Sequence, residues 1–272
     1  MTDELYSVPA VSRTVCILDA FAERPEWTVS ALAAQLRLPK TTVYRIVQTL
    51  VEAGVLESLQ EYRVRLGTRV CAWAQSYSPA VPFVEPLIPV LERLVEVTTE
   101  TANAAVIRGR NSMVVATRSG PHSVRSVTWT GRTAPLHCSA VGKALLAQQS
   151  DEFVTWYVSQ GLDRLTSQTV TAPHELRKTL SEVRSAGFSW ERDQLEEGLW
   201  CVGAPVCRLG AETLAISVSA PAYRAARRWS QLVEHVRRAS ATASRALGQY
   251  VQQAQLPVPR PEDAGHRLGR PA

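Results

Sequence analysis

The feature that most limits the folds open to this chain is a series of three short amphipathic helical patterns near its N-terminus. The third pattern is the clearest. Over residues 39–53, apolar side chains recur with the spacing of one helical face: Val43, Ile46, Val47, Leu50 and Val51. Pro39 suits the first turn of such a helix, and Gly54 suits its end. The pattern predicts a short helix with one buried face and one polar face.

Two shorter patterns precede this helix. A first helix, which Pro25 ends, is expected to turn four apolar residues inward: Val11, Val15, Leu18 and Ala22. Thr28 is the expected N-cap of a second helix, and residues 37–39 form the turn into the third. Two β-type runs follow at 55–57 and 62–64. Three helices and a small hairpin make the winged helix-turn-helix plan, which binds DNA.

The polar face of the third helix carries side chains suited to DNA. Arg and Gln can pair bidentately with base edges, and Thr can reach phosphate or a thymine methyl group. The expected DNA-binding residues are those of this face and two of the hairpin: Lys40, Thr41, Thr42, Tyr44, Arg45, Gln48, Thr49, Tyr62 and Arg63. The pattern alone also fits a solvated amphipathic helix in an ordinary helical domain.

Net charge does little to decide between a DNA-binding helix and an ordinary solvated helix. The chain has a formal net charge of +5 at pH 7, but residues 1–80 contain eight basic and eight acidic residues and are neutral. A basic patch remains within that neutral segment, because Arg37, Lys40 and Arg45 lie in the window 37–48, which holds no acidic residue.

Prolines at positions 79, 82 and 86 mark a boundary in the chain. Beyond it, helices are expected at 86–98, 139–148, 173–186 and 222–248, and strands at 103–107, 113–117, 188–191, 203–208 and 213–220. This order predicts an α+β fold with a mainly antiparallel sheet. The expected domains are a DNA-binding domain at 1–67, a linker helix at 68–82, an α/β domain at 83–250 and a disordered tail at 251–272.

Several protein classes are excluded. No apolar run reaches about 18 residues and no secretory signal pattern occurs, so a cytoplasmic protein without a membrane span is expected. The five cysteines, at 16, 71, 138, 201 and 207, are odd in number and form no CxxC pair. They fit free thiols in the reducing cytosol better than a disulfide framework or a zinc site. No metal and no cofactor is expected.

Four segments in a fixed order carry a family resemblance: residues 38–50, 62–67, 135–147 and 198–219. The third begins Pro135-Leu136-His137-Cys138-Ser139 and is the most specific. Together they resemble the IclR family of bacterial transcription regulators. The resemblance implies an N-terminal winged helix that binds double-stranded operator DNA and a C-terminal, GAF-like domain that binds a small effector. It also implies self-association as a dimer or a dimer of dimers.

The resemblance further implies an effector pocket. Its positions correspond here to Asn103, Ala105, Met113, His137, Ser139, Ala140, Val141, Glu191, Leu199, Cys201, Ser217 and Ser219. Amides at the N-terminus of the 139–147 helix favour an anionic group, and Glu191 favours a donor such as a hydroxyl or an amine. The expected effector is a small organic acid or an aromatic compound.

Departures from the family pattern bear on both sites. Arg37 stands where the family has Gly, which implies a strained turn. Glu191 and Gln194 stand where it has Asp and Glu. A competing class remains open: a GAF-like enzyme or redox sensor that uses the thiol of Cys138 or Cys201, with the helical N-terminus as a dimerisation module. The adjacency of His137 and Cys138 opposes catalysis, because neighbouring residues on a strand point to opposite sides.

Overall fold

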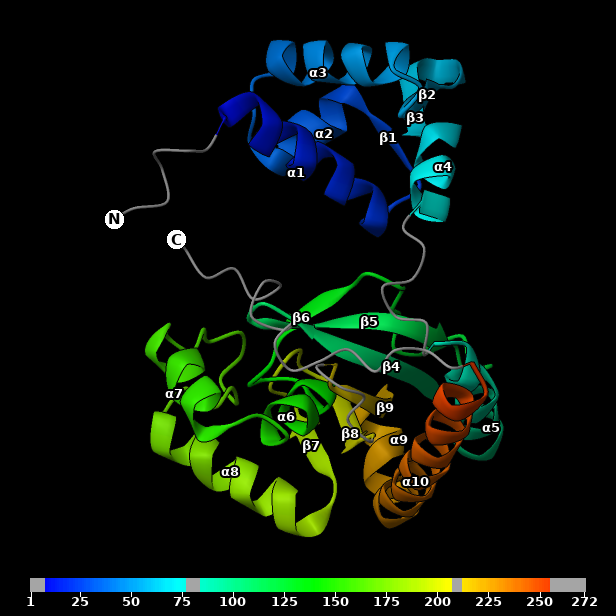
Figure 1. The fold of residues 1–272 in the computed structure, drawn as a ribbon. Coiled ribbons are helices and arrows are strands. Elements are labelled where there is room, and N and C mark those ends of the chain that lie inside the picture. The colour runs from blue at the N-terminus through cyan, green and yellow to red at the C-terminus, as the bar shows by residue number, and fades with distance from the viewer. Residues whose placement is uncertain (1–7, 77–83, 207–211, 255–272) are drawn as a thin grey trace. The chain divides into compact units, whose positions relative to one another are not determined.

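The computed structural model describes residues 8–76, 84–206 and 212–254 of the chain, which divides into two compact units, Met1–Ala80 and Val81–Ala272 (Figure 1). Each unit is described by itself. The first contains α1 (Pro9–Glu23), β1 (Glu26–Thr28), α2 (Val29–Leu36), α3 (Lys40–Glu52), β2 (Leu56–Ser58), the 3-10 turn η1 (Gln60–Tyr62), β3 (Arg63–Leu66) and α4 (Thr68–Ser76).

Local chemistry sets the ends of the short helices. Thr28 Oγ1 accepts a hydrogen bond from the amide of Ala31 at 3.2 Å, which confirms Thr28 as the N-cap of α2. Gly54 follows α3 with a φ of +70°, the left-handed conformation that ends many helices. Within α3, Val43, Val47 and Leu50 are buried, so the opposite, polar face points outward.

The face that α1 buries differs from the expected one. Ile17, Ala20 and Phe21 are buried, whereas Val11 and Val15 are 60% and 50% exposed. The indole Nε1 of Trp27 donates to the carbonyl of Ala20 at 3.0 Å and ties this face to β1. The predicted helix is confirmed, but the apolar face read from the spacing is not the buried one, because the helix is apolar on two sides and spacing alone does not show which side packs.

The predicted hairpin is confirmed as β2 and β3, and a third strand joins it. The antiparallel order is β1-β3-β2, with Trp27 opposite Val64 and Leu56 opposite Leu66. Sequence periodicity did not predict β1, since three residues are too few to show strand alternation.

The second unit is built on a six-stranded antiparallel sheet of order β6-β5-β4-β9-β8-β7, as the fold prediction required. The strands are β4 (Thr101–Arg108), β5 (Asn111–Arg118), β6 (Thr133–Pro135), β7 (Ser189–Arg192), β8 (Leu199–Pro205) and β9 (Leu214–Pro221). The helical elements are η2 (Glu85–Leu87), α5 (Ile88–Thr98), α6 (Ala140–Ala147), α7 (Asp151–Ser159), α8 (Pro173–Ala186), α9 (Ala222–Arg227) and α10 (Trp229–Ala254).

Two boundaries differ from those expected. The helix predicted at 222–248 is two helices, α9 and α10, and Arg228 between them donates to the carbonyls of Thr98 and Val97 at 3.0 and 3.3 Å. Residues 251–254 belong to α10, although the tail was predicted to begin at 251. The rest of that tail lies outside the described residues.

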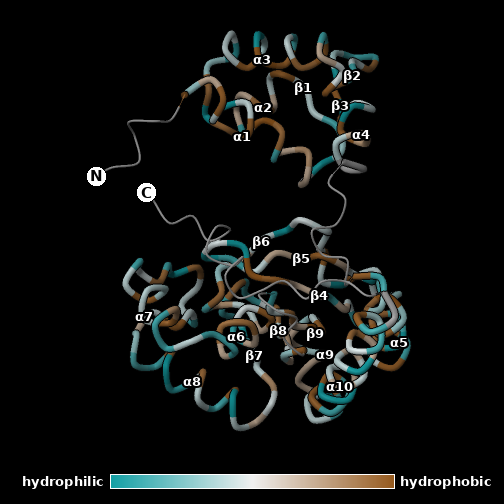
Figure 2. Tube along the Cα trace, viewed as in Figure 1, coloured by the Kyte–Doolittle hydropathy of each residue, from teal (hydrophilic) through white to brown (hydrophobic). Residues whose placement is uncertain are grey.

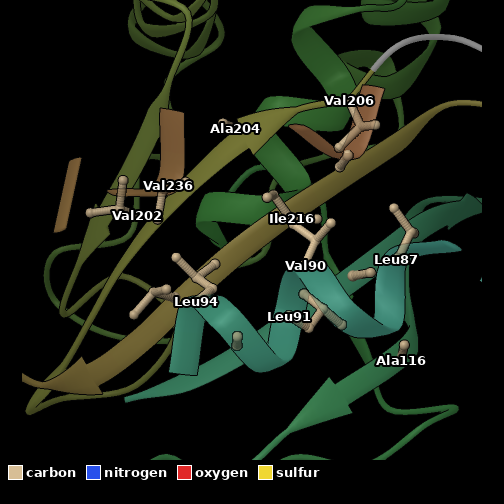
Figure 3. Packing of buried hydrophobic residues seen from close by; sticks show 14 of the residues in the cluster. Leu87, Val90, Leu91, Leu94, Ala116, Val202, Ala204, Val206, Ile216 and Val236 are labelled. Atoms are coloured by element: carbon tan, nitrogen blue, oxygen red, sulfur yellow. The ribbon is translucent and has the colours of Figure 1, made fainter. Parts of the chain in front are cut away.

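Helices cover both faces of the sheet. On one face, α5 and α10 bury Leu91 and Val236 against strand residues such as Ile216 (Figure 3). On the other face, α6, α7 and α8 enclose a second apolar cluster that includes Leu145 and Leu180 (Figure 1). Along α10, hydrophobic residues recur among hydrophilic ones (Figure 2), as expected for a helix that packs on one side.

Candidate functional site

The outward face of α3 carries the residues expected to contact DNA. Thr42 and Gln48 are half-buried, and the other expected residues of this helix are exposed: Lys40, Thr41, Tyr44, Arg45 and Thr49. The hydroxyl of Thr49 donates to the carbonyl of Arg45 at 3.0 Å and so stays close to its own helix. The structure brings the whole predicted set of α3 onto one surface.

The turn that leads into α3 is strained. Arg37 has φ 53° and ψ 41°, the left-handed conformation that glycine adopts without cost, so the expected strain is confirmed. Its amide donates to the carbonyl of Ala34 at 3.3 Å, and that of Leu38 donates to the carbonyl of Ala33 at 3.0 Å. These bonds hold the turn in place despite a cost of about 1 kcal/mol for a side chain there.

Cationic side chains on α3 and on the hairpin differ in whether they form ion pairs. Arg63 pairs with Glu26 at 2.8 Å, and Arg65 pairs with Glu57 at 3.0 Å. Lys40 and Arg45 form no ion pair among the described residues. Tyr62, at the tip of the hairpin, is 93% exposed. The two cations of α3 are therefore not neutralised by carboxylates of the described residues, whereas those of the hairpin strand are.

A second group of predicted residues lies on the face of the sheet that α6 covers, where they form a buried polar cluster: Asn103, Glu191, Cys201, Ser217 and Ser219. The strand register brings them together, because Asn103 lies opposite Ser217, and Cys201 lies between Glu191 and Ser219. Asn103 Nδ2 and Cys201 Sγ both approach Ser219 Oγ, at 3.4 and 3.2 Å.

The first turn of α6 is held closely against β8. Ser139 Oγ accepts from the amide of Gly142 at 3.1 Å, which makes Ser139 the N-cap of α6. Ser189 Oγ donates to the carbonyl of Ala140 at 2.6 Å. A Cβ at Gly203 of β8 would lie 2.9 Å from that carbonyl oxygen, so glycine is needed there. The amides of Ala140 and Val141, in the first turn of the helix, have no acceptor within it.

Two ionisable side chains are buried at this cluster. Glu191 Oε2 accepts from the amides of Gln194 and Leu195 at 2.9 and 3.4 Å, and Oε1 accepts no hydrogen bond from the described residues. Lys143 Nζ donates to Gln194 Oε1 at 2.6 Å. Burial raises the pKa of Glu191 to about 7 and lowers the pKa of Lys143 to about 8, and the opposite charge of each limits the shift of the other.

Lys143 and Gln194 were not among the predicted ligand residues. The sequence held a signal for the lysine: it is the one charged residue in 140–147, and the rest of that segment is apolar or glycine. A lone lysine in an apolar helix needs a polar partner when the helix is buried. Its partner, Gln194, lies 51 positions away and could not be identified from spacing.

His137 contacts protein groups rather than the cluster. Its Nε2 donates to the carbonyl of Asp163 at 2.9 Å, and the hydroxyl of Tyr157 donates to Nδ1 at 2.8 Å. The carbonyl can only accept, which fixes the proton on Nε2. Burial lowers the pKa of His137 and favours its neutral form. Both ring nitrogens are occupied, so the structure gives His137 a role in holding the α7 region.

Met113 lies on the opposite face of the sheet from the one expected. The β4–β5 hairpin pairs Arg108 with Asn111, so Met113 lies opposite Val106 and packs against the α5 and α10 cluster. A bulge in β5 comes only after Met113, where Ala105 pairs with Val114 but Ala104 pairs with Ala116. Ala105 does face α6, and Leu199 is half-buried at the start of β8.

Both cysteines considered as nucleophiles are buried. Cys138 Sγ approaches the carbonyl of Pro135 at 3.5 Å, and its pKa is raised to about 12, mainly by burial. Burial also raises the pKa of Cys201. Such thiols form little thiolate at neutral pH and react slowly. Over the described ranges, no three His, Cys, Asp or Glu side chains gather where they could hold a metal ion.

Known proteins match both units. The family model for the bacterial transcriptional regulator IclR C-terminal domain covers residues 76–245, and the model for the IclR helix-turn-helix domain covers residues 10–60. The HTH-type transcriptional regulator BhcR of Paracoccus denitrificans is 30% identical over 80% of this chain and 79% of its own length. The transcriptional repressor IclR of Escherichia coli is 28% identical over 80% of this chain and 81% of its own.

A solved structure has the same fold. An IclR homologue from Microbacterium hydrocarbonoxydans, complexed with 4-hydroxybenzoate, gives a TM-score of 0.71 at 26% identity, over 88% of this chain and 99% of that one. No helix in the described part of the chain has the length and apolar character needed to cross a bilayer. The relatives are transcriptional regulators, which overturns the competing assignment to a thiol enzyme. The chain belongs to the IclR family of bacterial transcriptional regulators and has the helix-turn-helix DNA-binding domain of that family.

Proposed function

We propose that this regulator responds to a small molecule and places α3 in the major groove of operator DNA. The unpaired cations of α3 carry the proposal. Lys40 and Arg45 are exposed and form no ion pair among the described residues, whereas Arg63 of the wing, which is the β2–β3 hairpin, is paired with Glu26. Cations that are not neutralised by the protein, set among polar side chains, are what phosphate and base contacts require.

The residues of this surface take different roles. Arg45 and Gln48 lie one turn apart on α3, and both have the geometry to bind base edges bidentately. Lys40, in the first turn, is assigned to phosphate, and Tyr62 at the wing tip to the backbone or minor groove. Residues 1–67 form the DNA-binding domain in this proposal, 68–82 the linker and 83–250 the effector domain. A regulator of this kind acts where the bacterial DNA is, in the cytoplasm.

The buried polar cluster is the proposed binding site of the small molecule. The first-turn amides of Ala140 and Val141 suit an anionic group, and Glu191 Oε1 is open to a hydrogen-bond donor. A structural relative is complexed with 4-hydroxybenzoate. These observations support a small organic or aromatic acid that also carries a hydroxyl or an amine.

Self-association completes the proposal. One helix-turn-helix covers a half-site, so tight binding favours a symmetric dimer, or a dimer of dimers, on a nearly palindromic operator. Val11 and Val15 on α1 and Trp73 on α4 are apolar and exposed, and we assign the contact to them. A ligand alters DNA binding in such an assembly only if its affinity differs between the DNA-competent and DNA-incompetent states.

Fluorescence anisotropy with the DNA upstream of the chain's own gene tests this function. We expect tighter binding to that DNA than to a shuffled duplex of equal length and composition. Adding 4-hydroxybenzoate or related acids is expected to change the affinity for the upstream DNA. Equal affinity for both duplexes contradicts sequence-specific regulation. An affinity that no acid in a broad panel changes contradicts control by a ligand at this site.

A further inference from the structure

The turn at the tip of the wing has a sequence that does not suit its shape. The amide of Arg63 donates to the carbonyl of Gln60 and closes a tight turn around Glu61 and Tyr62. Both central residues are left-handed, with φ of 61° and 57°. Turns with positive φ at both central positions favour Asn-Gly or Asp-Gly, because a Cβ is crowded in this conformation. The Glu-Tyr pair therefore strains the turn.

Packing within the protein does not account for the tyrosine. Tyr62 is 93% exposed, so its ring lies in solvent. Asparagine would adopt the left-handed conformation more easily and would also supply a hydrogen-bond donor. What tyrosine adds at this position is a flat, largely apolar ring held at the tip of a hairpin. Strained residues of this kind cluster where a protein holds a ligand or a partner.

The charges around the tip oppose a contact driven by cations. Arg63 pairs with Glu26 at 2.8 Å and with Glu61 at 3.4 Å, and Arg65 pairs with Glu57 at 3.0 Å. Carboxylates of the protein thus neutralise both arginines, which weakens the attraction of the wing for phosphates. An aromatic ring can instead contact the sugars and base-pair edges that line the minor groove, and such a contact releases no counterions.

Building on the proposed placement of α3 in the major groove, we propose that Tyr62 packs its ring into the adjacent minor groove of the operator and senses the shape of that groove. The wing follows α3 in the chain, and β2 and β3 lie beside it in the same unit (Figure 1). The affinity that Tyr62 adds depends on the groove and not on salt, whereas the affinity that Lys40 and Arg45 add depends on salt.

Tyr62→Gly separates the strain of the turn from the use of the ring. Urea unfolding of the full chain is expected to show the transition of the DNA-binding unit at a higher urea concentration, because glycine removes the crowded Cβ. Operator affinity is expected to fall by about ten-fold, with an unchanged slope against salt concentration. Loss of affinity together with a gain in stability is an effect that a merely structural role of Tyr62 would not produce.

Two variants of the same turn serve as controls. Glu61→Gly relieves the neighbouring strain but keeps the ring, so it should raise the urea midpoint without lowering operator affinity. Tyr62→Phe removes only the hydroxyl and should bind the operator like the wild type.

A modified duplex identifies the groove that the ring enters. Replacing the adenines of the operator with 2,6-diaminopurine adds amino groups to the floor of the minor groove and leaves the major-groove edges unchanged. The wild type is expected to lose affinity for this duplex by about the same factor as Tyr62→Gly loses for the natural one. The affinity of Tyr62→Gly should be the same for both duplexes.

The outcomes separate this contact from the proposed function. The role of Tyr62 is overturned if Tyr62→Gly binds the operator as tightly as the wild type, or if its loss of affinity flattens the salt dependence. An equal loss in Tyr62→Phe would assign the contact to the hydroxyl, and an equal effect of the modified duplex on the wild type and Tyr62→Gly would exclude the minor groove. All these results leave α3 as the DNA reader. Failure of the wild type to prefer the upstream DNA overturns the proposed function, and the role of Tyr62 with it.

Discussion

Two buried ionisable side chains, Glu191 and Lys143, set the charge of the polar cluster in the C-terminal unit. The pKa of Glu191 is raised to about 7 and that of Lys143 is lowered to about 8, so both lie near physiological pH. A single new hydrogen bond at Glu191 Oε1 changes the proton balance of the pair. His137 behaves differently, because the hydroxyl of Tyr157 and the carbonyl of Asp163 already occupy both of its ring nitrogens.

Replacing Glu191 by glutamine should remove one pH dependence of stability. Because burial raises its pKa from 4.5 to about 7, the folded wild type keeps a proton that the unfolded chain releases once the pH exceeds 4.5. The wild type is therefore expected to lose stability relative to Glu191→Gln as the pH rises from about 5 to about 7. The difference is at most about 3 kcal/mol, and coupling to Lys143 reduces it.

Urea denaturation of both proteins across this pH range measures the difference. Ser217→Ala, a neutral change in the same cluster, serves as the control and should follow the wild type in its pH dependence. Stabilities of the wild type and Glu191→Gln that change in parallel with pH would show that Glu191 titrates normally in the folded state.

Replacing Lys40 and replacing Arg45 should affect DNA binding in different ways. Arg45→Ala is expected to weaken binding to the operator by about 1–3 kcal/mol and to affect unrelated DNA less, because base contacts carry the specificity. Lys40→Ala is expected to weaken binding to all DNA alike and to lower the salt dependence by about one phosphate contact. Anisotropy titrations at several salt concentrations measure both effects.

A wing arginine provides the control for these variants. Arg65 is held by Glu57 at 3.0 Å, so Arg65→Ala should change operator affinity little. Equal losses for Arg45→Ala on the operator and on unrelated DNA would remove Arg45 from base recognition.

At the scale of elements, the turn between α2 and α3 offers a direct gain in stability. Arg37 holds a left-handed conformation in which its Cβ is crowded, and the described residues give its side chain no ion pair. Arg37→Gly is expected to stabilise the DNA-binding unit by about 1 kcal/mol. Urea unfolding of the full chain, monitored by circular dichroism, should show the transition of the DNA-binding unit at a higher urea concentration. Arg37→Ala keeps the Cβ and should show no such gain; an equal gain would attribute the effect to loss of charge.

Elements with their own local signals could be predicted from the sequence. The caps of α2 and α6, Thr28 and Ser139, and the glycines that follow α3 and α8, Gly54 and Gly187, act within a few residues of the chain. The short strands β1 and β6 depend on partner strands elsewhere, and their three residues show no periodicity of their own. The helix α7 was also missed. The sequence of α1 offers two apolar faces, and only tertiary packing shows that the face with Ile17 and Phe21 is the buried one.

The proposed ligand cluster could be predicted as a set of residues but not as an arrangement. Family positions brought Glu191 and Cys201 into the list, and strand register then placed them side by side. The family positions gave no face for Met113, which the register of β4 and β5 places opposite Val106. The contact of Lys143 with Gln194 joins a helix to a loop distant in the sequence, so only the folded chain shows it.

At the scale of the whole molecule, the proposed self-association would set the affinity for DNA. A half-site contact made by one α3 is weak by itself, and a second contact within the same assembly becomes effectively intramolecular. The side of α1 that faces away from its own unit is apolar, with Val11 and Val15 exposed. A face of that kind is available to a second copy of the chain.

Polar substitutions on α1 should therefore separate assembly from folding. The double variant Val11→Ser, Val15→Ser removes apolar contact area at positions that the unit itself leaves exposed, so the fold should be retained. We expect sedimentation to show a shift toward monomer, and operator affinity to fall by about 100-fold as cooperation between two half-sites is lost. Val124→Ser, at a valine that is 65% exposed in the other unit, is the matched control and should preserve both. If the double variant assembles and binds like the wild type, the subunit contact lies elsewhere, and the outward valines of α1 have no part in it.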